Sequence, residues 1–259
     1  MSVIDDELVN LSFKAIKKAG EIALDYSKKD ITFEYKSKNQ PVTKADLEIN
    51  NFLKGFFHDH TPMFGWISEE SVDNKSRFKN NLFWCVDPID GTRSFINKKP
   101  EYSISIALVD KKNPIFGIVY NPSTNENFYA IKKQGAFCNE KKITVGETNE
   151  LKLATIAISS SESDRLEKKK LQVKDVEKIG SIAYKIALVA KGKIDATLSF
   201  TRKSDWDIAA ASLILEEAGG KISLINGDQI NYNTKDLKIP SLISANKIIH
   251  KKFCDIICN

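Results

Sequence analysis

Cysteine and histidine are scarce in this chain of 259 residues, which has four cysteines and three histidines. The cysteines lack the paired spacing of a zinc ribbon, and too few histidines are present to complete such a site. A chain of this length buries a sizeable core and needs no disulfide to hold it. We therefore expect a reduced, cytoplasmic protein, with Cys254 and Cys258 as half-buried thiols in a terminal helix.

Long apolar runs and a strong excess of one charge are also missing. No stretch approaches the about 20 apolar residues that span a bilayer, and residues 1–6 lack the basic and apolar regions of a signal peptide. The net charge is +5, from 39 basic and 34 acidic residues, and it is spread out apart from Lys168, Lys169 and Lys170. We expect neither a membrane nor a nucleic acid as partner, although the balance would attract an anionic metabolite.

The remaining composition is that of a folded protein, with 42% hydrophobic and 28% charged residues. Apolar residues at helical spacing predict a helix over residues 5–26, and Thr43 is a good N-cap for a second helix after it. The period then changes to that of strands. Strands are expected over residues 82–86, where the apolar run stops at Asp87-Pro88, and in an antiparallel meander over residues 102–109, 114–120 and 128–131.

From about residue 151 the pattern alternates between strand and helix. The predicted elements are strands 154–159 and 195–200 and helices 182–191 and 207–218, the helices ending at Gly192 and at Gly219-Gly220. The expected fold is therefore α/β overall, with an α+β N-terminal portion, residues 1–145, and an α/β C-terminal portion, residues 146–259. No linker separates the two portions, so we expect them to pack as one body.

The most informative segment covers residues 84–95. A buried strand ends in Asp87 and Asp90, three residues apart, with a proline fixing the turn between them. Gly91 and Thr92 then offer backbone N–H groups and a hydroxyl where a helix or turn begins. Carboxylates alone would repel phosphate, whereas carboxylates loaded with magnesium beside such N–H groups would bind it.

Further acidic residues lie elsewhere in the chain. Glu69 and Glu70 follow an aromatic and apolar stretch that predicts a strand. Asp207 begins a C-terminal helix, and Asp46 lies near an early one. Hard cations prefer oxygen ligands, and two adjacent cations need several shared carboxylates. These scattered acids therefore indicate a magnesium site.

Together the motifs resemble the inositol monophosphatase superfamily, which includes inositol monophosphatases, nucleotidases acting on 3'-phosphoadenosine 5'-phosphate and fructose-bisphosphatase relatives. They occur in the family's order: Pro-Val-Thr-Lys-Ala-Asp at 41–46, Ser-Glu-Glu at 68–70, Asp-Pro-Ile-Asp-Gly-Thr at 87–92, Trp-Asp-Ile-Ala-Ala-Ala at 206–211 and Glu-Ala-Gly-Gly at 217–220. The Asp-Pro-Ile-Asp-Gly-Thr element is specific, whereas Trp-Asp alone is weak. The resemblance implies a layered αβαβα sandwich, two or three magnesium ions, competition by lithium and often a homodimer.

The resemblance also implies roles for individual residues. Asp46 and Thr92 would orient and deprotonate the water that attacks phosphorus, with no covalent phosphoenzyme. The backbone N–H groups of Gly91 and Thr92 would hold phosphate oxygens. The magnesium ligands would be four carboxylates and one backbone carbonyl: Glu69, Asp87, Asp90, Asp207 and the carbonyl of Ile89. Glu70 stays open, either behind these ligands or on the surface.

The choice of phosphate ester depends on basic residues, because a second phosphate would pair with Arg or Lys. Inositol monophosphatases usually carry a glutamate before the Trp-Asp pair, where this chain has Phe200. We therefore expect 3'-phosphoadenosine 5'-phosphate as substrate, as in the 3'(2'),5'-bisphosphate nucleotidase branch of the family. The candidate contacts are Lys185 and Arg202, with Arg93 and Lys203 as further candidates.

Two alternatives remain open. The ester could be inositol 1-phosphate, in which case these cations are surface residues. The chain could instead be a non-catalytic regulatory protein that meets RNA or another protein through its basic face. Such a relative is expected to lose a metal ligand or the water-activating pair, and this sequence retains all of them.

Overall fold

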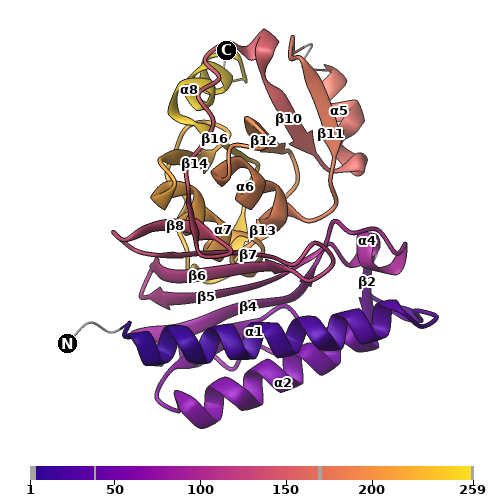
Figure 1. The fold of residues 1–259 in the computed structure, drawn as a ribbon, viewed down its shortest axis with the longest axis vertical. Helices are drawn as coiled ribbons and strands as arrows, with labels where there is room; N and C mark the ends of the chain where they lie inside the picture. The colour runs from indigo at the N-terminus through magenta and orange to yellow at the C-terminus, as the bar shows by residue number, and fades with distance from the viewer. Residues whose placement is uncertain (1–3, 38, 169–170, 258–259) are drawn as a thin grey trace.

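The computed structural model describes residues 4–37, 39–168 and 171–257, which form five stacked layers (Figure 1). Two helices cover one face of a large sheet, two more separate it from a second sheet, and a last pair packs on that sheet's outer face. In that order the helices are α1 (Asp6–Ser27), α2 (Lys44–His60), α6 (Ile182–Ala190), α7 (Asp205–Glu217), α5 (Ser163–Lys168) and α8 (Lys247–Ile257). The expected αβαβα sandwich is confirmed.

The large sheet has seven strands in the order β3-β4-β5-β6-β7-β8-β9, antiparallel except for the β3–β4 pair. Its strands are β3 (Gly65–Ser68), β4 (Leu82–Asp90), β5 (Ser103–Asp110), β6 (Asn113–Asn121), β7 (Glu126–Ile131), β8 (Gly135–Cys138) and β9 (Lys141–Ile143). The second sheet has the order β11-β10-β12-β16-β14. Its strands are β11 (Asp175–Lys178), β10 (Thr155–Ile158), β12 (Ala196–Ser199), β16 (Leu242–Asn246) and β14 (Gly220–Leu224).

The described chain also has shorter elements. They are the hairpin β1 (Phe33–Ser37) and β2 (Gln40–Thr43), the helical turns α3 (Ser76–Lys79) and α4 (Thr92–Ile96), and the paired strands β13 (Lys203–Ser204) and β15 (Lys238–Ile239). Within the described ranges, no helix has the length and apolar character needed to cross a membrane. Lys169, Lys170 and Cys258 lie outside the described residues.

Both faces of the large sheet are buried because helices cover each of them, and its strands send alternate side chains to the two cores. On β4, Trp84 and Val86 join the core under α1 and α2, whereas Phe83 and Cys85 join the core under α6 and α7. This alternation explains why the strand reads as one continuous apolar run.

Helix α7 lies directly on the large sheet. A Cβ atom at Gly117 of β6 would stand 2.8 Å from the Cα of Ala210, a distance that real Cβ atoms do not adopt. Ala209, Ala210 and Ala211 are fully buried at this contact. Small side chains on both elements therefore set the separation between α7 and the sheet.

The predicted helices and meander are confirmed, with two differences. The strand expected to stop at Asp87-Pro88 continues to Asp90, so that prediction was wrong. A register shift between Asp87 and Asp90 leaves Pro88 outside the regular ladder, which is how a proline without an N–H group is accommodated. Helix α7 begins at Asp205, two residues earlier than expected, because Ser204 is its N-cap. The boundary near residue 145 stays a prediction.

The close approach at Gly117 can be tested by unfolding in urea. Gly117→Ala is expected to lower the free energy of unfolding by about 1–3 kcal/mol, because the added methyl group forces α7 away from the sheet. Gly55→Ala on α2 is the matched control, since nothing lies within 4 Å of its added Cβ. It is expected to raise stability by about 0.5–1 kcal/mol. Equal effects at the two positions would contradict this account of the packing.

Candidate active site

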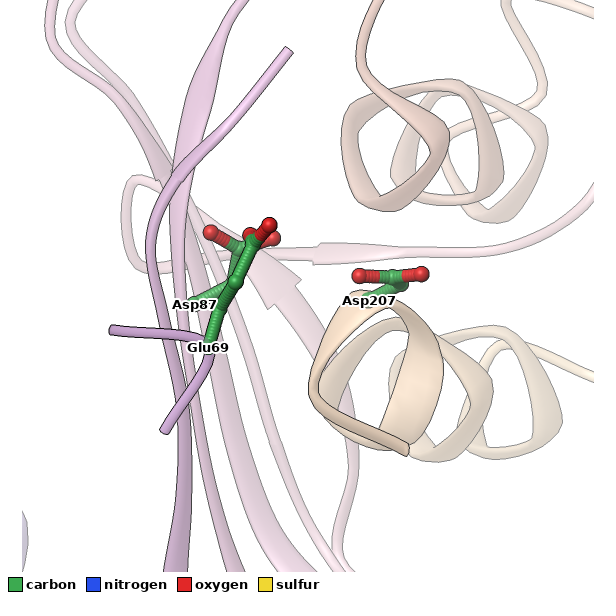
Figure 2. A group of neighbouring side chains, drawn as sticks. All are labelled: Glu69, Asp87 and Asp207. Atoms are coloured by element: carbon green, nitrogen blue, oxygen red, sulfur yellow. The ribbon is translucent and has the colours of Figure 1, made fainter. Parts of the chain in front are cut away.

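Two acidic residues reach the α7 side of the large sheet by strand alternation. Asp87 on β4 has the same parity as Phe83 and Cys85, whose side chains face α7. Glu69 directly follows β3, and its N–H donates to the carbonyl of Val86, so it lies beside Asp87. Figure 2 shows the two carboxylates together on the sheet side.

Asp207 faces this pair from the opposite layer (Figure 2). It occupies the first turn of α7, where its Oδ2 accepts the N–H of Ser204 at 2.7 Å in a capping box. One ligand oxygen from each of Glu69, Asp87 and Asp207 lies within 4.8 Å of the others. The structure thus brings together three of the predicted metal ligands from two layers of the fold.

Asp90 is buried nearby but is fixed by α6. Its Oδ2 accepts hydrogen bonds from Ser181 Oγ at 2.5 Å and from the N–H of Ala183 at 2.6 Å, at the start of that helix. The carbonyl of Ile89, the fifth predicted ligand, accepts a hydrogen bond from Thr92 Oγ1 at 3.0 Å. Asp90 therefore joins the acidic site to the first turn of α6.

The predicted water-activating pair is also in contact. Asp46 is buried in the first turn of α2, where its Oδ2 accepts from the N–H and hydroxyl of Thr43. Its Oδ1 lies 3.4 Å from Thr92 Oγ1, a long contact beside the shorter bond from Thr92 to Ile89. The hydroxyl of Thr92 therefore links Asp46 to the end of β4.

Burial raises the pKa values of these carboxylates. It raises the pKa of Asp46 to about 7, against hydrogen bonds from Thr43 that lower it. Burial and then the charge of Glu69 raise the pKa of Asp207 to about 8 and that of Asp87 well above its usual range. The pKa of Asp90 rises to about 6 through burial, although Ser181 and Ala183 stabilise its ionised form. Negative charge at these positions is therefore unfavourable unless positive charge is added nearby.

One lysine supplies part of that charge. Lys36, from β1, places its Nζ 2.9 Å from Glu69 Oε1 and 2.5 Å from Glu70 Oε1. The side chain of Glu70 is only 3% exposed. Of the two positions left open for Glu70, this burial fits the one behind the metal ligands and not the one on the surface. Sequence reasoning missed Lys36, since a lysine in an exposed hairpin carries no local signal.

A pocket of about 440 Å³ opens beside the carboxylates. Among its lining residues are Glu69, Gly91 and Thr92, so the predicted phosphate-binding turn reaches it. Gly91 has φ of +89°, and an added Cβ there would stand 3.0 Å from the carbonyl oxygen of Glu101. Only glycine fits this turn without strain.

Only one of the four predicted basic substrate contacts lines the pocket directly in the described part of the chain. Lys185 is fully buried and donates to Ser159 Oγ at 2.8 Å, so it reaches the pocket only through that serine, which lines it. Arg202 is exposed and, in the described part of the chain, is not among the lining residues. Lys203 bonds to Thr201 at 2.6 Å. Arg93 does line the pocket.

Ser181 is another residue that sequence reasoning missed. It is the N-cap of α6, it is fully buried, and it donates to Asp90. A signal was available, because a serine after Gly180 and before an apolar helix is a typical N-cap. That signal gives the capping role and says nothing of the link to Asp90.

The donor set suits a hard divalent cation. Its atoms are carboxylate oxygens, which magnesium and calcium prefer. The raised pKa values of Asp87 and Asp207 reflect buried negative charge that a bound cation would stabilise. No cysteine or histidine is part of the acidic group found within the described ranges, as a softer metal would require.

The model of the inositol monophosphatase family matches residues 5–259. This chain belongs to the inositol monophosphatase family. The resemblance predicted from the motifs is therefore confirmed.

Relatives in two substrate classes are similarly close. The chain is 29% identical over 250 residues to the 3'(2'),5'-bisphosphate nucleotidase CysQ of Haemophilus influenzae, with 92% of each chain covered. It is 32% identical over 247 residues to inositol monophosphatase 2 of Solanum lycopersicum, covering 89% of this chain and 92% of the relative. An IMPase structure from Thermotoga maritima has a TM-score of 0.86 at 27% identity, with 97% of each chain covered. The family and these relatives support a phosphatase, without selecting one ester.

The raised pKa values predict how stability depends on pH. Asp46 and Asp207 have folded-state pKa values of about 7 and about 8, above the value of about 4 in the unfolded chain. The folded protein therefore binds protons more tightly, and without metal its free energy of unfolding should fall as pH rises from about 4 to 8. Each kcal/mol lost lowers the melting temperature by about 2–4 °C.

Magnesium should reverse this trend, because it competes with protons for the same oxygens. Thermal melts at pH 5 and pH 8, with and without MgCl2 and with NaCl at matched ionic strength, measure the effect. We expect a larger rise in melting temperature from magnesium at pH 8 than at pH 5. An equal rise at both pH values would contradict the assignment of these carboxylates.

Proposed function

We propose that this protein is a magnesium-dependent phosphomonoesterase that hydrolyses a small phosphate ester with water. The observation that carries the proposal is the group formed by Glu69, Asp87 and Asp207, with ligand oxygens within 4.8 Å of one another. Glu69 also lines the adjacent pocket, together with the Gly91-Thr92 turn. An anionic phosphate would enter such a pocket only if cations offset the acidic wall.

Glu69, Asp87, Asp90, Asp207 and the carbonyl of Ile89 would hold the magnesium ions. When bound, magnesium lowers the pKa of a bound water and neutralises negative charge on the phosphate. The capping box of Asp207 and the hydrogen bonds to Asp90 keep these carboxylates in fixed orientations. Their geometry is therefore set by helix ends.

Asp46 and Thr92 would remove the proton of the attacking water. Thr92 Oγ1 would take that proton while passing its own to Asp46 Oδ1, 3.4 Å away. A pKa of about 7 for Asp46 suits a group that accepts a proton near neutral pH. The water oxygen then attacks phosphorus, the ester P–O bond breaks, and the leaving oxygen takes a proton from solvent. Backbone N–H groups of Gly91 and Thr92 would hold the phosphate oxygens.

We propose 3'-phosphoadenosine 5'-phosphate as the substrate, on the evidence of the pocket lining. Arg93, Lys99 and Lys178 line the pocket, as do the hydroxyl-bearing Ser159 and Ser160. Three cations and a row of hydroxyls suit a second phosphate away from the reacting one. The 440 Å³ volume lies within the range of small-molecule sites. Arg93, Lys99 and Lys178 are therefore the candidate contacts for a second phosphate, in place of the exposed Arg202.

Inositol 1-phosphate is the second candidate, favoured by the 32% identity to inositol monophosphatase 2 of Solanum lycopersicum. Competition by lithium, a homodimer and a cytoplasmic location remain predictions. A magnesium-dependent turnover assay also distinguishes the enzyme from a regulatory protein of the same fold that binds RNA without turnover.

The metal assignment is tested by Asp87→Asn, which removes one ligand charge with little change of shape. Phosphate release should fall by at least about a hundredfold, because a ligand of this kind accounts for several kcal/mol of transition-state stabilisation. Circular dichroism and the melting temperature should show a folded protein. Glu70→Gln serves as a neighbouring control with a smaller expected loss. Turnover of Asp87→Asn near that of the natural protein would rule out the proposed site.

The substrate is tested by neutralising the pocket cations. Lys178→Gln and Lys99→Gln should each raise KM for 3'-phosphoadenosine 5'-phosphate about tenfold, because each removes a charge-assisted contact. KM for inositol 1-phosphate should change little. Arg202→Gln is the matched control, since Arg202 is exposed and outside the pocket lining within the part of the chain described here. Equal KM shifts for both esters would argue against a subsite for a second phosphate.

A further inference from the structure

A completely buried arginine, Arg77, lies between two of the family motifs but belongs to neither of them. Arg77 belongs to the short turn α3, and its side chain has 0% exposure. A buried guanidinium is costly unless its donors are paired. Its hydrogen bonds therefore show which segments of the fold Arg77 links.

Those bonds run mostly to one distant loop. Nη1 donates to Asn233 Oδ1 at 2.6 Å and to the carbonyl of Thr234 at 3.0 Å. Nη2 reaches the carbonyl of Lys235 at 3.4 Å, and Nε pairs with Asp73 at 3.0 Å. The planar fork of an arginine is suited to holding several acceptors in fixed directions.

The same loop holds the start of α7. Asn233 adopts φ of 56°, and its N–H donates to Asp205 Oδ2 at 2.6 Å. Its side-chain amide also donates to the carbonyl of Lys111 at 2.8 Å, so the loop is fastened to the large sheet as well. Asp205 is the first residue of α7, and Asp207 lies in the same helical turn.

We infer that Arg77 is a positioning residue for the metal site, acting through Asn233 and Asp205 to hold Asp207 against Glu69 and Asp87. Arg77 and both sheet carboxylates belong to the first portion of the chain, whereas Asp207 comes from α7. The chain of hydrogen bonds therefore fixes the one ligand that crosses between layers. This inference rests on the proposed function, because it assumes that the three carboxylates bind a cation.

The test measures magnesium binding directly, by isothermal titration calorimetry, and alongside it the magnesium dependence of turnover. Arg77→Lys keeps the charge and loses the fork, so the dissociation constant for magnesium should rise about tenfold, as for other groups that orient metal ligands. At saturating magnesium, kcat and the KM for the phosphate ester should return close to the values of the natural protein. Asn233→Gly tolerates the positive φ at this position but removes the side-chain amide that accepts from Arg77. It should weaken magnesium binding in the same way, and it replaces Arg77→Lys as the test if that variant does not fold.

Asn246→Ala is the matched control for general loosening of the fold. Asn246 is also buried and ties distant segments, donating to the carbonyls of Gly146 and Thr148, on elements that carry none of the three carboxylates. It should lower the melting temperature while leaving the magnesium dissociation constant within about twofold. Unchanged magnesium binding in both Arg77→Lys and Asn233→Gly, or equal weakening in Asn246→Ala, would overturn the inference. If the natural protein binds magnesium but releases no phosphate from any ester, the proposed function fails while the calorimetric comparison still decides the role of Arg77.

Discussion

Mutual repulsion among clustered carboxylates is the constraint on which the rest of the structure depends. Glu69 and Asp87 come from the sheet, and Asp207 comes from α7, yet ligand oxygens from all three lie within 4.8 Å of one another. Such a group disperses unless other interactions hold its members in place. The capping box at Ser204, the α6 contacts of Asp90 and the pairing of Lys36 with Glu69 are the interactions that do so. Much of the local structure therefore serves to keep like charges together.

The parts of the site that the sequence could predict are those encoded within a few residues. The segment from Asp87 to Thr92 is visible because a strand, a proline and a glycine turn follow one another directly. Thr43 and Asp46 form their capping box locally, so the start of α2 was also predictable. The layer order followed from the change between helical and strand periods.

The parts that could not be predicted depend on contacts between distant segments. Lys185 occupies a helix position next to the expected site, but whether its amine faces the pocket or Ser159 is decided by packing in three dimensions. The pairing of Arg77 with Asn233 joins segments that share no pattern. Even the end of β4 was misjudged, because a register shift allowed the strand to pass Pro88. The local sequence pattern predicts helices, strands and turns, whereas the direction of a polar side chain depends on tertiary packing.

The contact of α7 with Gly117 has a consequence for synthesis on the ribosome, where the chain emerges from its N-terminus. The sheet face that carries Phe83 and Cys85 is covered by helices encoded much later in the chain. Until α7 leaves the exit tunnel, a nascent chain presents that apolar face and an acidic cluster without its last member. Such an intermediate is prone to aggregate. A chaperone that bound the exposed sheet face during this stretch of translation would protect the chain from aggregation.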